Sequence, residues 1–151
     1  MQTIHGDLIQ LALEGKFEVI IHGCNCFCTM GAGIAKSIQH HFPEAYQADL
    51  ATPKGDAAKL GTISQAKVTT PNGALTVVNG YTQFHWKGQG RKANYEAIRE
   101  VFKQIKSSFS GLRIGYPAIG AGLAGGDWTV IAHIIEEELE GEDHTFVIYQ
   151  L

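Results

Sequence analysis

Two glycine-rich segments each follow a run of β-forming residues and lead into a stretch with helical spacing. The first covers Asn25–Ala35 after Val19–His22, and the second covers Gly120–Gly126 after Ile114–Pro117. A loop in this position presents backbone N–H groups and a helix N-terminus to an anion. Two such loops facing each other would suit a diphosphate. The alternative is that the glycines serve only tight turns.

Predicted strands and helices alternate along the chain. The strands are expected at 2–4, 19–22, 60–70, 74–82, 112–116 and 145–149, and the helices at 7–13, 34–41, 44–50, 95–108 and 128–139. Val19–His22 has no polar alternation, which is typical of a strand covered on both faces. Pro71-Asn72-Gly73 predicts a hairpin turn. The pattern indicates an α/β fold, a three-layer α/β/α sandwich with a mixed central sheet, with ligands bound at the carboxyl ends of the strands.

Length and charge narrow the possibilities further. The 151 residues predict one domain over 1–151, and 12 Lys plus Arg against 15 Asp plus Glu give a formal net charge of −3. A broad basic footprint for duplex nucleic acid is therefore not expected, and any bound anion must be held locally. No apolar run reaches the ~18 residues of a membrane span, and Met1–His5 does not resemble a signal peptide, so we expect a cytoplasmic protein with no membrane partner. We also expect a monomer.

Three cysteines alternate at Cys24, Cys26 and Cys28. Their odd number and close spacing predict reduced thiols instead of disulfides. With His22 they could form a zinc site, but four ligands at every second residue do not resemble the paired clusters of structural zinc sites. Small, buried cysteines at a strand end are the favoured interpretation, with no metal.

The second glycine segment matches the dinucleotide pattern G-x-G-x-x-G by letter, at Gly120–Gly125. A Rossmann unit also needs a following strand that ends in an acidic residue, whereas the next predicted strand ends at Tyr149-Gln150. Neither glycine segment contains the Gly-Lys-Ser/Thr of a Walker A loop. A dehydrogenase and a P-loop NTPase are both disfavoured.

Four segments together resemble the macro domain family, which binds ADP-ribose. They are Gly6-Asp7-Leu8, 21–26 with 30–35, 117–128 and 147–151. The chain is most similar to the branch that contains ADP-ribose-1″-phosphate phosphatases and terminal ADP-ribose glycohydrolases acting on glutamyl esters. The resemblance implies an ADP-ribose-1″-phosphate phosphatase without metal or organic cofactor. Two alternatives stay open, an enzyme that removes ADP-ribose from protein or a nucleic-acid end, and a reader that binds ADP-ribose without turnover.

The resemblance also implies roles for single residues. Asp7, with Leu8 beside it, would bind the adenine amine, Asn25 would bind the distal ribose, and Tyr149 or Leu151 would cover the adenine. Two sets would wrap the pyrophosphate and distal ribose, namely Met30, Gly31, Ala32, Gly33, Ile34 and Ala35, and Ile119, Gly120, Ala121, Gly122, Leu123, Ala124 and Gly125. The structural alternatives are a helix cap for Asp7, a left-handed (αL) turn residue for Asn25 and sheet packing for Tyr149.

His22 and Asp127 are the candidate catalytic residues, because hydrolysis at the anomeric carbon needs a group that moves a proton. The phosphatase members resemble this chain in having histidine at the position of His22. The alternative for His22 is a packed, hydrogen-bonded histidine, and the alternative for Asp127 is a helix N-cap. The chain departs from the ester-cleaving members, since Gln83 stands where they have a nucleophilic lysine and Ala124 aligns near their aspartate. A shift in loop register would be needed for Lys87 to replace that lysine.

A short segment after the hairpin is both basic and aromatic. It contains His85, Trp86, Lys87, Arg91 and Lys92. We expect a solvated loop there. The alternative is that it flanks the distal end of the ligand and meets a phosphate or a nucleic-acid terminus.

Overall fold

The computed structural model describes residues 1–151 and confirms the predicted alternation of strands and helices. The elements are β1 Gln2–Gly6, α1 Leu8–Leu13, β2 Val19–Cys24, α2 Gly33–His41, α3 Pro43–Leu50, the 3₁₀ helix η1 Ala57–Lys59, β3 Ile63–Thr70, β4 Gly73–Tyr81, α4 Tyr95–Phe109, β5 Ile114–Tyr116, α5 Trp128–Glu138 and β6 His144–Tyr149. The third helix begins at Pro43, one residue earlier than predicted, because proline is well tolerated at the first position of a helix.

All six strands form one mixed sheet in the order β1-β6-β5-β2-β4-β3. Every neighbouring pair is parallel except β3 and β4, which form the predicted antiparallel hairpin. The strand β2 lies between β5 and β4, with Val19 opposite both Ile114 and Thr76. The carboxyl ends of five strands therefore meet at one edge of the sheet, and both glycine-rich segments begin there.

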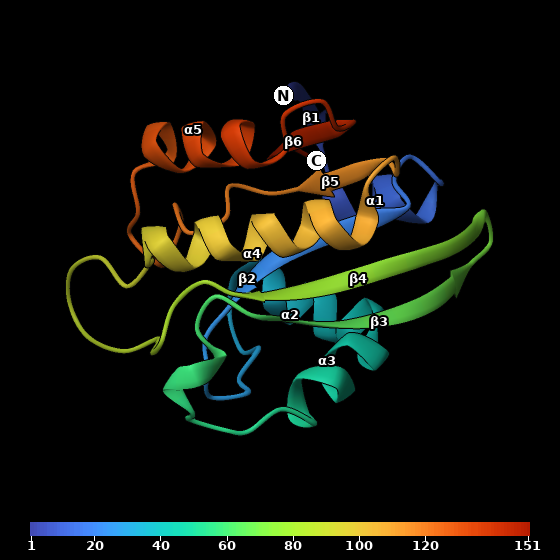
Figure 1. Cartoon of the computed structure of the whole chain (residues 1–151). Coiled ribbons are helices and arrows are strands. Elements are labelled where there is room, and N and C mark those ends of the chain that lie inside the picture. The colour runs from blue at the N-terminus through green and yellow to red at the C-terminus, as the bar shows by residue number, and fades with distance from the viewer.

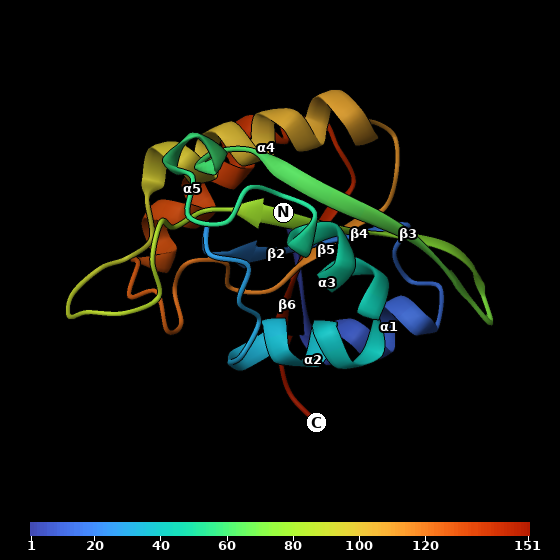
Figure 2. The same ribbon diagram turned by 90° about the horizontal axis from the view of Figure 1, so that it is seen from below.

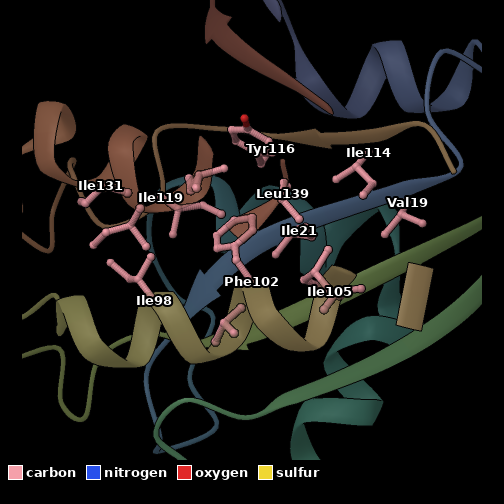
Figure 3. Close-up of a cluster of buried hydrophobic side chains, with 14 of the residues drawn as sticks. Val19, Ile21, Ile98, Phe102, Ile105, Ile114, Tyr116, Ile119, Ile131 and Leu139 are labelled. Carbon is pink, nitrogen blue, oxygen red and sulfur yellow. The ribbon is translucent and has the colours of Figure 1, made fainter. Parts of the chain in front are cut away.

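Helices cover both faces of the sheet, which confirms the three-layer architecture. Helices α4 and α5 lie on one face, and α1, α2 and α3 lie on the other (Figures 1 and 2). Residues of β2 alternate between the two layers: Val19 and Ile21 pack with α4 and α5, and Ile20 packs with the other three helices. Figure 3 shows the first of these cores, in which Phe102 of α4 lies next to Ile21 of β2 and Tyr116 of β5. None of the helices is both long and apolar enough to span a membrane.

Candidate functional site

A cleft of about 750 Å³ opens at the edge where the parallel strands end. Its walls come from the segments that follow β2, β4 and β5, which are neighbours in the sheet. The lining residues are Gly23 and Cys24 at the end of β2, Asn25, Thr29, Gly31, Ala32, Gly33, Ile34 and Ala35 after it, Thr82, Gln83, Trp86 and Lys92 after β4, and Pro117, Ala118, Ile119, Gly120, Gly122, Leu123 and Ala124 after β5. The two glycine-rich loops thus form opposite walls of one site.

The first loop leaves a run of backbone N–H groups free. The N–H groups from Gly31 to Ala35 donate to no protein acceptor. They include the first turn of α2, whose N-cap residue Ala32 makes no side-chain capping bond. Gly33 opens the helix with a φ of 58°, a conformation that glycine adopts without strain. This wall therefore presents the positive end of a helix and several unused donors to the cleft.

The second loop is folded on itself and leaves a matching set of donors. Gly126 N–H donates to Gly120 O at 2.7 Å, and a Cβ on Gly126 would lie 2.5 Å from the same oxygen, so only glycine fits there. The N–H groups of Gly122, Leu123 and Ala124 donate to no protein acceptor. The two walls approach closely, since a Cβ on Gly33 would lie 3.7 Å from Leu123 Cδ1. Both walls of the cleft therefore contain backbone N–H groups without a protein acceptor.

The side chain of Asn25 shapes the first loop. Its Nδ2 donates to Thr29 Oγ1 at 2.7 Å and to Thr29 O at 3.1 Å, and its Oδ1 accepts from Phe27 N–H at 2.8 Å. The side chain therefore closes a turn, but the alternative interpretation of Asn25 as a left-handed turn residue is wrong, because Cys28 is the one residue other than glycine with a positive φ. Asn25 also lines the cleft, as its predicted contact with the distal ribose requires.

Thr82 contributes a polar group that the protein itself leaves unused. It follows β4 directly, lines the cleft and is 1% exposed, and its Oγ1 makes no hydrogen bond. This oxygen lies 2.7 Å from the position of a Cβ on Gly23, at the floor of the cleft. A buried hydroxyl without a partner costs free energy, so Thr82 is an exception to the rule that buried polar groups are paired. We did not predict Thr82 from sequence, although its place at the carboxyl end of a buried strand was the available signal.

One basic side chain, Lys92, lines the cleft. The other ionisable lining group is the Cys24 thiol, whose pKa burial raises well above its ordinary value, so it stays protonated. No carboxylate or imidazole lines the cleft. The site therefore suits an anion. All three cysteines are free and buried, which confirms their predicted reduced, packed state.

His22 does not reach the cleft, so the structure corrects its assignment to proton transfer. Its ring is fully buried, with Nε2 2.7 Å from Asn79 Oδ1. Burial lowers the pKa of His22 to about 4, which keeps the ring neutral near pH 7. Gly23 and Cys24, the last two residues of β2, line the cleft, whereas His22 precedes them in the strand and packs beneath the cleft.

Asp127 likewise does not line the cleft. Its side chain is exposed and caps α5, accepting a hydrogen bond from Thr129 N–H at 2.9 Å. Among the predicted loop contacts, Met30 is buried behind the wall, and Ala121 and Gly125 do not line the cleft. Lys87 is exposed and also lies outside the lining, so it does not take the place of a lysine at Gln83.

The residues assigned to adenine lie together on the same edge of the sheet, outside the enclosed part of the cleft. Asp7 caps α1 through Oδ1, which accepts from Ile9 N–H and Gln10 N–H at 2.9 and 3.2 Å, while its Oδ2 makes no hydrogen bond. Leu8 is buried in α1. Tyr149 pairs with Gly6 across β1 and β6 and is 70% exposed, and Leu151 is also exposed. The cap and a ligand contact are compatible, because the carboxylate has two oxygens.

Comparison with known proteins places this arrangement among relatives. A model of the Macro domain family matches residues 21–135. An uncharacterized 17.5 kDa protein from the tk-vs intergenic region of Enterobacteria phage T4 is 36% identical over 141 residues, which is 90% of this chain and 88% of the phage protein. A DNA ADP-ribosyl glycohydrolase of Thermus aquaticus is 28% identical over 146 residues, covering 93% of this chain. The chain spans 38% of that relative's length.

Solved structures share the fold over the whole chain. A protein of unknown function from Bacteroides thetaiotaomicron superposes with a TM-score of 0.76 at 25% identity over 99% of both chains. The macrodomain of Mycobacterium tuberculosis DarG superposes with a TM-score of 0.72 at 21% identity, and the match covers 99% of this chain and 97% of that macrodomain. Thermosipho africanus DarTG in complex with ADP-ribose superposes with a TM-score of 0.72 at 19% identity, and the match covers 100% of this chain and 42% of the DarTG chain.

Proposed function

Because the chain belongs to the macro domain family, we propose that its cleft binds ADP-ribose. The observation that carries this proposal is the pair of facing walls whose backbone N–H groups, at 31–35 and 122–124, have no protein acceptor. A diphosphate between the walls would give these donors partners, and Lys92 would add the single positive side chain. The Thermosipho africanus protein of the same fold holds ADP-ribose, which supports the same ligand here.

The residues around the cleft suggest how ADP-ribose would be oriented in it. The adenine would lie at the open edge beside Asp7 and Tyr149, where Asp7 Oδ2 is free to accept from the exocyclic amine. The distal ribose would reach the floor, where Asn25 and the unpartnered hydroxyl of Thr82 offer hydrogen bonds. Gln83 and Trp86 border the same end, so a group attached to the distal ribose leaves the cleft past them.

For the reaction, we favour release of ADP-ribose from a modified nucleic acid over the phosphatase activity that the first interpretation put forward. The phosphatase interpretation depended on His22, which is buried away from the cleft. The relative of Thermus aquaticus, which aligns with 93% of this chain, is a DNA ADP-ribosyl glycohydrolase. In this proposal water attacks the anomeric carbon of the distal ribose, the bond to the nucleic acid breaks, and the departing atom takes up a proton.

The chain's own groups near that bond are few. Thr82 and Gln83 would orient the ribose hydroxyls, and the Lys92 ammonium would donate a proton or hydrogen bond to the departing group. The absence of a carboxylate or imidazole from the lining favours one second candidate, a reader that binds ADP-ribose without turnover. The two candidates share the binding site and differ only in whether product forms.

The test supplies three substrates in parallel: a single-stranded oligonucleotide carrying ADP-ribose, a protein carrying ADP-ribose on glutamate, and ADP-ribose-1″-phosphate. The proposal predicts free ADP-ribose from the oligonucleotide, at a rate reduced about tenfold or more in Lys92→Met and unchanged in Lys16→Met, which is far from the cleft. Phosphate release from the third substrate alone would restore the phosphatase interpretation. Binding of ADP-ribose with no product from any substrate would establish the reader.

A further inference from the structure

The connection between β4 and α4 carries a concentration of positive charge in an otherwise acidic chain. Lys87, Arg91 and Lys92 lie in this connection, and the sequence contains no Asp or Glu between Asp56 and Glu96, whereas the whole chain has a formal net charge of −3. These cations make no salt bridge to a carboxylate. The surface at this end of the cleft is therefore locally attractive to a polyanion.

The same connection carries two large aromatic side chains that are exposed to solvent. Phe84 is 39% and Trp86 is 42% exposed. Both rings pack on Phe27 of the loop after β2, with ring centroids 5.0 and 5.7 Å apart, and the ring of His85 stacks on Trp86 at 4.3 Å. Exposed aromatic rings that are held in place are typical of a binding surface. They are not typical of a solvated loop.

Backbone contacts fix this arrangement further. Cys26 N–H donates to Phe84 O at 3.0 Å, and Lys87 N–H donates to His85 Nδ1 at 2.9 Å. Gln83 Nε2 donates to His85 O at 3.0 Å. The Trp86 ring is thus held in a defined position, with His85 stacked on one face and Lys87 Nζ 5.4 Å from the ring centroid, so less conformational freedom is lost when a base packs against its exposed part. We name Phe84, His85, Trp86, Lys87, Arg91 and Lys92 the aromatic-basic rim.

The rim continues the cleft into a second hollow. Trp86 and Lys92 line the cleft, and Lys92 with Arg91 also lines a neighbouring hollow of about 520 Å³ formed by residues 91–96. Arg91 lies over the ring of Tyr95, with 4.0 Å from its guanidinium carbon to the ring centroid. A chain attached to the distal ribose therefore meets the aromatic side chain of Trp86 first and, beyond it, a hollow lined by two cations, Arg91 and Lys92, and one carboxylate, Glu96.

We propose that the aromatic-basic rim binds a short single-stranded segment of nucleic acid next to the ADP-ribosylated nucleotide, with a base stacked on Trp86 and phosphates at Lys87 and Arg91. This inference rests on the proposed function and adds the recognition of the strand itself. An aromatic face beside cations is the combination that single strands require, because every base has a face to stack and every nucleotide a phosphate. Three cations in one loop are too few for a duplex footprint.

The experiment measures fluorescence anisotropy of an unmodified ten-nucleotide single-stranded DNA with the whole protein at two salt concentrations, beside calorimetry of ADP-ribose. We expect Trp86→Ala and the double variant Lys87→Ala/Arg91→Ala each to weaken binding of the DNA about tenfold. The double variant also flattens the slope of log affinity against log salt by about 1.4. Its affinity for ADP-ribose stays within twofold of the wild type, because neither residue lines the cleft.

Two matched controls separate the rim from the rest of the surface. Lys16→Ala/Lys67→Ala removes two exposed cations far from the cleft, and Leu50→Ala removes an exposed apolar side chain of α3. Both controls keep wild-type DNA binding if the rim is the site. Equal binding by the wild type and the rim variants overturns the proposal, as does binding of poly-glutamate in preference to DNA. Failure to bind ADP-ribose overturns the proposed function instead, and the DNA titration still decides the role of the rim.

Discussion

Nε2 of His22 and Oδ1 of Asn79 lie 2.7 Å apart, fully buried beneath the floor of the cleft. Asn79 is itself fixed, because its Nδ2 donates to Ala45 O at 2.9 Å and to Ser64 Oγ at 3.0 Å. The pair therefore joins β2 and β4 to the helical layer on one face of the sheet. A histidine in this position acts on the stability of the fold.

The first prediction concerns the pH dependence of stability. The pKa of His22 is lowered from 6.5 to about 4 by burial, so the unfolded chain binds a proton that the folded protein does not accept between these values. The stability that the neutral ring provides is complete above pH 6.5 and is lost as the pH falls toward 4. Protonation of His22 in the unfolded chain should therefore lower the free energy of unfolding by about 2 kcal/mol as the pH falls from 7 to 5.

Urea unfolding at both pH values measures this loss. His22→Gln keeps a neutral polar side chain that does not titrate, so its unfolding free energy should fall less over the same interval. His144 is also buried and its pKa is lowered, and its contribution is common to both proteins. Equal losses in the wild type and His22→Gln would contradict the assigned role.

A second prediction concerns the unused hydroxyl of Thr82. Thr82→Val keeps the shape of the side chain and removes an oxygen that has no partner, so the unfolding free energy should not fall. The affinity for ADP-ribose should fall about fivefold if the hydroxyl bonds the ligand. Thr82→Ser is the control that keeps the hydroxyl. Calorimetry and urea unfolding of both variants decide the matter, and an unchanged affinity in Thr82→Val would remove Thr82 from the site.

A third prediction compares two glycines of the second loop. Gly126→Ala should lower the unfolding free energy by about 1 to 3 kcal/mol, since its Cβ would lie 2.5 Å from Gly120 O. Gly122→Ala meets no atom within 4 Å and should fold normally. Because Gly122 lines the cleft, its added methyl should still lower the affinity for ADP-ribose. If Gly122→Ala binds as well as the wild type, the ligand does not approach this part of the wall.

A fourth prediction separates the two roles of Asp7. Asp7→Ala should lose about 1 kcal/mol of unfolding free energy with the N-cap, whereas Asp7→Ser should keep the cap. Both variants lack the second carboxylate oxygen, so both should bind ADP-ribose about tenfold more weakly. Thermal unfolding and calorimetry distinguish the effects. Wild-type affinity in Asp7→Ser would show that the adenine contact is absent.

Local patterns in the sequence were sufficient for most of the fold. The segment Val19–His22, which has no polar alternation, predicted the central strand, and Pro71-Asn72-Gly73 predicted the antiparallel hairpin, because strand burial and turn chemistry are properties of neighbouring residues. The two glycine-rich loops were predicted as parts of one site, since loops after adjacent parallel strands meet at the same edge.

The direction of single side chains at strand ends could not be predicted in the same way. His22 and Gly23 are adjacent in sequence, and the residue at which β2 ends relative to its neighbouring strands decides which of them reaches the cleft. Lys92 reaches the cleft through a connection whose path depends on the packing of Phe84 and Trp86 on Phe27. Contacts between distant segments of this kind have no local signal.

The most direct test of the central claim is calorimetric titration of the protein with ADP-ribose and, separately, with AMP, which lacks the diphosphate and the distal ribose. If the unused N–H groups of the two loops hold a diphosphate, ADP-ribose should bind at one site per chain and at least about tenfold more tightly than AMP. Equal affinity for the two ligands, or no binding of ADP-ribose, would contradict the assignment of the cleft.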